Sequence, residues 1–107
     1  MAYRYRLTPL AIVDIDDVLD YISEKLMNPG AANQLYLAIQ QEIASICDGP
    51  FAFPDCSYYL IYDKNIRHSV IGKYILIYEV SQSEAMIKVL RFLYGGRNIS
   101  NLKLTTQ

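Results

Sequence analysis

The side chains that could do chemistry lie in the second half of the chain. Guanidinium and ammonium groups can neutralise a phosphate, and histidine, tyrosine or glutamate can transfer a proton, so together they could cleave RNA without a metal ion. The basic and aromatic members could equally bind an anionic partner. The candidates are Arg67, His68, Lys73, Glu79, Arg91, Tyr94 and Arg97.

Each candidate also has an ordinary structural explanation. An arginine taken alone is more often a solvated strand residue or a salt-bridge partner than a catalyst. His68 falls among alternating apolar residues, where a packed histidine is common. Glu79 could simply pair with a neighbouring lysine or arginine. Tyr94 is the tyrosine to test first, because it sits between Arg91 and Arg97.

Charge is distributed unevenly along a chain whose net charge is −1 and whose pI is near 5.7. Residues 1–63 hold three basic side chains against nine acidic ones, and residues 64–107 hold seven basic against two acidic. One surface could therefore attract an anionic partner that the other repels, although an acidic helix face beside ordinary strand lysines would give the same count.

The composition predicts no metal site and no cofactor. Cys47 and Cys56 form no CxxC pair, and His68 is the single histidine in the sequence, so a zinc site is not expected. The opening MAYRYRLTP is unlike a secretory signal, and no long apolar stretch could span a membrane. We expect one cytoplasmic domain over residues 1–107, with reduced cysteines.

The first third of the chain predicts a short strand followed by a helix. Tyr3, Tyr5 and Leu7 alternate with arginines, as in a strand with one apolar face. Thr8 and Pro9 then give an N-cap and a proline at the first helical position. The helix should bury an apolar stripe and expose its aspartates. The stripe is Ile12, Ile15, Leu19, Ile22 and Leu26.

A second helix should begin after Asn28 with Pro29 and end before Gly49 and Pro50. So short a connection makes the two helices an antiparallel hairpin over a common core. Residues 49–65 predict a connecting loop, in which residues 58–62 could form a short strand. The apolar stripe of the second helix is Ala32, Leu35, Ile39, Ile43 and Ile46.

Three strands follow, at roughly 66–71, 74–80 and 86–94, separated by turn residues and forming an antiparallel meander. The order β-α-α-β-β-β predicts an α+β domain in which the helical hairpin packs on one face of a mainly antiparallel four-stranded sheet. We expect the other face, with its tyrosines, isoleucines and late arginines, to stay open to an amphipathic partner.

Two segments resemble the RelE/ParE family of toxins from bacterial toxin–antitoxin pairs. LTPLAIVDIDDVLDYISEKLMNPGAANQL is similar to the helical hairpin of ParE-type toxins, with a Leu-x-Pro opening and an Asn-Pro-x-Ala-Ala start to the second helix. RHSVIGKYILIYEVSQSEAMIKVLRFLYGGRN is similar to the end of the same family, which closes on Arg-hydrophobic-hydrophobic-Tyr/His-Gly-x-Arg. Together the resemblance covers most of residues 5–102.

The resemblance implies a toxin that stops growth and is neutralised by a cognate antitoxin, a role associated with plasmid stabilization. RelE-like members cleave messenger RNA in the ribosomal A site, whereas ParE-like members poison DNA gyrase. A nuclease would use Arg67, His68, Tyr94 and Arg97, whereas antitoxin or target binding would use Arg67, Lys73, Arg91, Tyr94 and Arg97.

Two observations favour the gyrase-binding alternative. The RelE-like pattern places an arginine where this chain has Ile75, and beyond Arg97 only NISNLKLTTQ follows, without tyrosine or histidine. A pI near 5.7 also suits a ribosome-binding nuclease poorly, because phosphate contacts dominate such affinity. An mRNA interferase and a non-toxic antitoxin-binding domain stay open, as do a homodimer and a larger toxin–antitoxin assembly.

Overall fold

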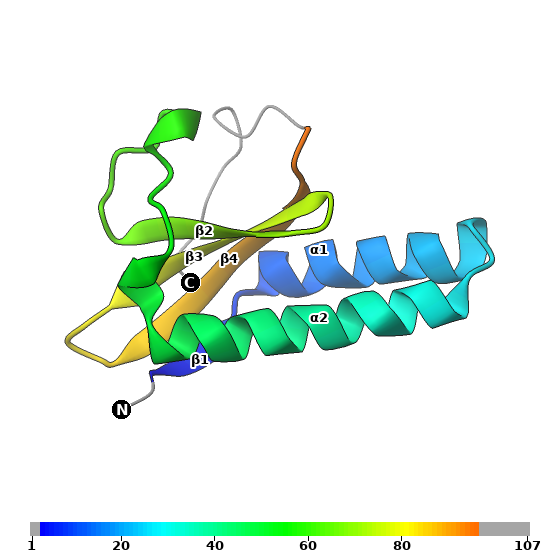
Figure 1. Cartoon of the computed structure of the whole chain (residues 1–107), viewed down its shortest axis with the longest axis horizontal. Coiled ribbons are helices and arrows are strands. Elements are labelled where there is room, and N and C mark those ends of the chain that lie inside the picture. Colours follow the sequence, from blue (N-terminus) through cyan, green and yellow to red (C-terminus); the bar gives the residue numbers. More distant parts are fainter. Residues whose placement is uncertain (1–2, 97–107) are drawn as a thin grey trace.

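Two helices pack on a four-stranded sheet in the computed structural model (Figure 1), which describes residues 3–96. In chain order the strands and helices are β1 (Arg4–Leu7), α1 (Pro9–Asp20), α2 (Pro29–Asp48), β2 (Ile66–Ile71), β3 (Tyr74–Ser81) and β4 (Met86–Tyr94). A π-helical turn (Tyr21–Lys25) extends α1, and two 3-10 turns (Pro50–Ala52 and Ser57–Tyr59) follow α2. The predicted order and fold class are confirmed.

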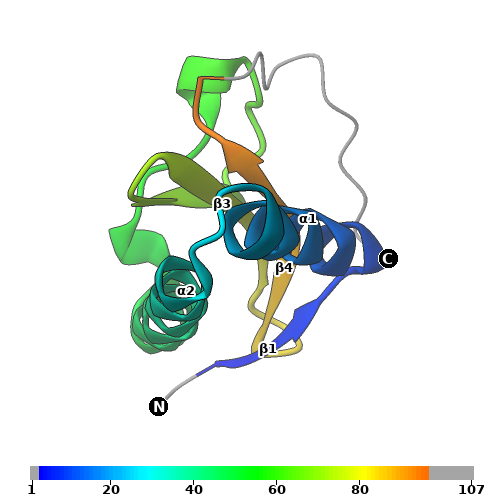
Figure 2. The same ribbon diagram turned by 90° about the vertical axis from the view of Figure 1, so that its right-hand side faces the viewer.

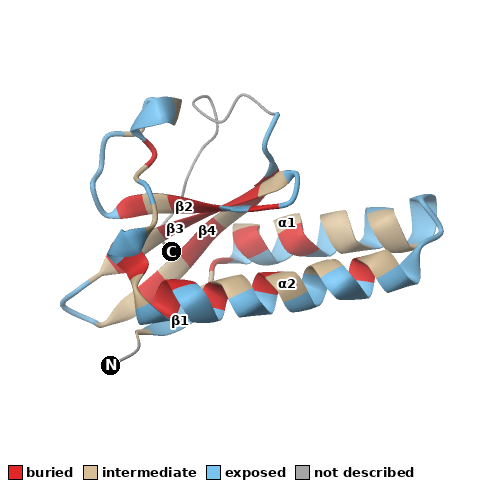
Figure 3. Ribbon diagram, viewed as in Figure 1, coloured by how far each residue is buried: buried red, intermediate tan, exposed pale blue. Residues whose placement is uncertain are grey.

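Both helices begin where the sequence predicts. The side chains of Thr8 and Asn28 each accept a hydrogen bond from the backbone N–H three residues on, and a proline follows each cap. The hairpin extends well beyond the sheet, and its far end is exposed (Figure 3). No helix within residues 3–96 is long and apolar enough to cross a membrane.

The buried stripe of α2 is the predicted one, but that of α1 differs. Ile12 is 45% exposed and Leu26 56% exposed, so both predictions were wrong. Ile15 is buried as predicted, and the other buried residue of α1 is Ala11, which was not in the predicted stripe. The core side of α1 is therefore turned toward residues 11, 14, 15 and 18, which share one helical face.

The sheet has the order β1-β4-β3-β2, with β1 parallel to β4 and the other pairs antiparallel. Pairing between β3 and β4 shifts in the middle: Ile77 lies opposite Arg91 and Tyr78 opposite Val89, so Leu90 is an extra residue. Such a β-bulge bends the strand and redirects its side chains. It separates the half of β4 that pairs with β1 from the half that lies against α1.

The main core lies between the helices and the sheet (Figure 2), where the two helices cover one face. It joins apolar residues of both helices to alternate residues of the strands. Tyr78 is fully buried there, and its hydroxyl donates to the carbonyl oxygen of Pro50 at 2.6 Å. This bond satisfies the hydrogen-bonding requirement of the buried Tyr78 hydroxyl.

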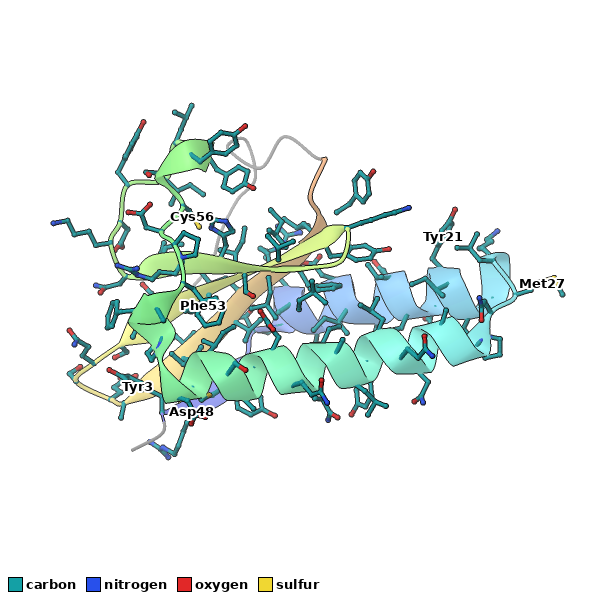
Figure 4. The ribbon with its side chains drawn as sticks, in the orientation of Figure 1. Tyr3, Tyr21, Met27, Asp48, Phe53 and Cys56 are labelled. Atoms are coloured by element: carbon teal, nitrogen blue, oxygen red, sulfur yellow. The ribbon has the colours of Figure 1, made fainter. Side chains whose placement is uncertain are left out.

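The segment after α2 wraps around the outer edge of β2. Phe53 packs into the main core, whereas Cys56 joins a second cluster with residues of the opposite sheet face, and Figure 4 shows the two on opposite sides of β2. Between them the carbonyl oxygen of Pro54 accepts a hydrogen bond from the His68 N–H at 3.0 Å. Residues 57–59 form a 3-10 turn, so the possible strand over residues 58–62 was wrong.

This second cluster corrects the expectation of an open sheet face. Ile77 and Leu90 are fully buried on that face, and Tyr59 and Ile61 pack over the cluster. The connecting segment supplies enough apolar side chains to form a small core of its own. A partner can therefore reach the middle of this face only by displacing that segment.

Thr8 joins α1 to the bulge of β4, and its loss should be costly. Its hydroxyl accepts from the Ala11 N–H at 3.2 Å and donates to the carbonyl oxygen of Leu90 at 3.1 Å, all buried. We predict that Thr8→Val lowers the free energy of unfolding by about 1–3 kcal/mol, because both buried groups lose their partner. Urea unfolding measures this. Thr8→Ser keeps the hydroxyl and should cost less; equal losses for both variants would contradict this role.

Candidate functional site

Arg67 is bound to the wrapped segment. On β2, its Nη1 donates to the carbonyl oxygen of Phe53 at 2.7 Å and to that of Phe51 at 3.3 Å, and its Nε donates to the carbonyl oxygen of Lys64 at 3.1 Å. The guanidinium carbon also lies 4.8 Å from the centre of the Phe51 ring. These contacts occupy most of its donors, so Arg67 holds the segment against the sheet.

His68 lies in the second cluster, beside Cys56. The His68 Nδ1 is 3.7 Å from the Cys56 Sγ, and the rings of His68 and Tyr59 pack edge to face. Burial lowers the pKa of His68, and a backbone hydrogen bond and the charge of Asp55 oppose that shift only in part. Burial likewise raises the pKa of the Cys56 thiol to about 11. Both groups are therefore neutral near pH 7, as packed residues are.

The two predicted arginines that the structure describes, Arg67 and Arg91, do not gather on one surface. Arg67 is on the edge strand β2 and Arg91 on β4, with β3 between them, so their backbones are roughly 10 Å apart. Arg67 is turned to the segment after α2, and Arg91 is bound to α1. For these two arginines, the expectation that one exposed sheet face collects the late cations was wrong, because each has a separate intramolecular acceptor.

Arg91 and Asp14 form a bidentate ion pair between β4 and α1. Arg91 Nε and Nη2 donate to the two carboxylate oxygens at 2.7 and 3.0 Å, and both side chains are only about a tenth exposed. The Phe92 N–H donates to the same carboxylate at 3.0 Å. The hydrogen bond to Asp14 raises the pKa of Arg91, which keeps the guanidinium charged.

Tyr94 and Lys73 lie at the corner where β4 ends. The backbone N–H of Gly95 donates to the carbonyl oxygen of Lys73 at 2.8 Å, which holds the end of β4 against the β2–β3 turn. Tyr94 is 55% exposed and meets Tyr74 edge to face, with ring centres 6.2 Å apart. Of the predicted residues, the structure thus brings Lys73 and Tyr94 to one corner, whereas Arg91 lies three residues earlier on β4.

A small hollow separates this corner from α1. Its volume is about 190 Å³, and its walls include Asp14 and Asp17 from α1, Tyr74 from β3 and Tyr94 from β4. The prediction from sequence missed Asp14, Asp17 and Tyr74. A signal for Asp14 existed, because it shares a helical face with Ala11 and Val18, and an acid at such a position needs a partner.

The remaining candidates lie elsewhere. Glu79 is opposite Lys88 in the β3–β4 register, and both line a polar hollow at the far end of these strands. Arg97 lies outside the described residues. Within residues 3–96, no three histidine, cysteine, aspartate or glutamate side chains are grouped as a metal site would require.

Comparison with known proteins agrees with this fold. The family model described as the ParE toxin of the type II toxin–antitoxin system, parDE, matches residues 5–99. The chain belongs to the ParE toxin family. Comparison with curated protein sequences gives no significant match.

Two solved structures share the fold of this ParE-family toxin. One is the chromosomal ParDE toxin–antitoxin system of P. aeruginosa, with a TM-score of 0.69 and 14% identity over 87% of this chain and 96% of that one. The other is the RelBE2 toxin–antitoxin complex of Mycobacterium tuberculosis, with a TM-score of 0.57 and 19% identity over 88% of this chain and 99% of that one.

His68 should make the stability of the toxin depend on pH. Its pKa is lowered from an ordinary value of 6.5, so between the folded and unfolded pKa values the unfolded chain binds more protons. The free energy of unfolding should therefore fall as the pH drops below about 7. Chemical unfolding at pH 7.5 and 5.5 measures this. His68→Gln should flatten the dependence; an unchanged slope in this variant would exclude His68 as its source.

Proposed function

We propose that this ParE-family protein stops growth by binding and poisoning DNA gyrase, and that a cognate antitoxin neutralises it. The match to the ParE model over residues 5–99 is the observation that carries the proposal. The intramolecular contacts of the basic side chains support a toxin that acts by binding its target and not by cleaving RNA. Arg67 is bound by backbone carbonyl groups and Arg91 by Asp14, so neither is placed to neutralise a scissile phosphate.

His68 supports the same proposal. A general base must reach its substrate within hydrogen-bonding distance, directly or through one water molecule. His68 is 9% exposed and is packed between Cys56 and Tyr59. Proton transfer from RNA to His68 would require the segment after α2, which carries Cys56 and Tyr59, to move away first.

The antitoxin is proposed on two grounds. The two structural relatives are described as toxin–antitoxin assemblies. The toxin also exposes apolar side chains on its helical hairpin, among them Tyr21 and Met27, which Figure 4 shows pointing outward. Exposed apolar surface of this kind commonly receives an amphipathic segment of a partner.

A ribosome-dependent endoribonuclease is the second candidate, and Arg97 is the observation that favours it. It follows the last strand, at the position of a phosphate-binding arginine in RelE-like enzymes that the sequence resembles. The endoribonuclease alternative predicts that messenger RNA is cleaved in the ribosomal A site in a translating extract and that Arg97→Ala abolishes this cleavage.

Gyrase activity in the presence of purified toxin decides between these functions. We predict that the toxin blocks supercoiling or traps cleaved DNA, and that the protein encoded in the adjacent reading frame relieves the inhibition. Normal supercoiling at saturating toxin would exclude the gyrase proposal. Normal supercoiling and intact message, together with tight binding of the neighbouring protein, would identify a non-toxic antitoxin-binding domain.

A further inference from the structure

The hollow between α1 and the end of β4 is shaped to hold one long side chain. Phe92 and Val18 form an apolar floor, and the Tyr74 and Tyr94 rings form a wall. Tyr74 also stacks on Phe92, with ring centres 5.1 Å apart, so the wall and floor support one another. A volume of about 190 Å³ suits a side chain better than a larger ligand.

The charge at the rim of the hollow is negative. Asp14 is neutralised by its bidentate pair with Arg91. Asp17, one turn further along α1, is exposed and lines the hollow as a second carboxylate. None of the described residues that line the hollow is basic. A positive group entering it would meet the Asp17 carboxylate and the aromatic rings of Tyr74 and Tyr94.

We propose that this hollow binds an arginine side chain from the antitoxin. The aliphatic part of that arginine lies against Val18 and Tyr74, and its guanidinium contacts Asp17 and the ring of Tyr94. Arginine suits the hollow because its planar group stacks on aromatic rings and is weakly hydrated. The inference rests on the proposed function, since it names the contact through which the antitoxin recognises the toxin.

The surface around the hollow favours a protein segment over a free small molecule. A second hollow continues along α1 and shares Asp17; its other lining residues are Asp20, Tyr21, Glu24 and one basic residue, Lys25. Val13 and Tyr21, on the same side of α1, are each more than half exposed. Acidic and apolar groups thus alternate along the helix, which complements a partner segment with basic and apolar side chains.

The hollow can be tested without the antitoxin, using N-acetyl-arginine amide as the probe. In an NMR titration of the labelled full-length toxin, the amide signals of Asp17, Tyr74 and Tyr94 should shift with this probe and not with its neutral citrulline analogue. Asp17→Asn should weaken binding about tenfold. Asp16→Asn, an exposed neighbour outside the hollow, should bind as the wild type does. Equal shifts with citrulline, or an unaffected Asp17→Asn, would overturn the proposal.

The second experiment measures binding of the protein encoded in the adjacent reading frame. Asp17→Asn and Tyr94→Leu should each raise the dissociation constant about tenfold, and Asp16→Asn should leave it unchanged. Wild-type binding by both variants would overturn the antitoxin arginine contact while leaving the toxin–antitoxin function intact. If the wild type itself does not bind the neighbouring protein, the proposed antitoxin fails instead, and with it this assignment of the hollow.

Discussion

The carboxylate of Asp14 is the interaction on which the arrangement of α1 and β4 depends. β1 pairs with β4 only as far as Val89, whereas β3 stays paired with β4 to Tyr94. The Phe92 N–H therefore has no partner on β1, and Asp14 of α1 is its acceptor. Asp14 accepts that N–H and also accepts hydrogen bonds from Arg91 Nε and Nη2. Removing it would leave a largely buried guanidinium and a backbone N–H without this partner, and such groups are costly to bury.

The basic second half of the chain does not form the cationic surface that its charge suggests, because its described arginines bind groups within the protein. The number of basic residues suggests a cationic surface that binds phosphate groups, but the two described arginines of this half stabilise the fold. Arg67 fastens the segment that wraps β2, and Arg91 fastens α1 to the sheet. The hollow beside the end of β4 is lined instead by aromatic and acidic side chains, among them Tyr74, Tyr94 and Asp17.

Local sequence signals were sufficient for most of the fold. Capping side chains followed by proline predicted the starts of both helices, and apolar runs bounded by turn residues predicted the three late strands, because these signals act over a few residues. The partners of the arginines could not be predicted in this way. Arg91 and Asp14 are 77 residues apart, and Arg91 lies directly after the bulge in β4, so no local pattern links the two residues. The wrapping of residues 50–62 around β2 likewise follows from tertiary packing.

Amide hydrogen exchange at Phe92 tests most directly whether Asp14 holds the end of β4. In the wild type and in Asp16→Ala this amide should be protected, and in Asp14→Ala its exchange should accelerate about tenfold or more. The amide of Leu76, in the centre of β3, reports global unfolding in the same sample and should change less. Equal protection of Phe92 in Asp14→Ala and the wild type would contradict the account.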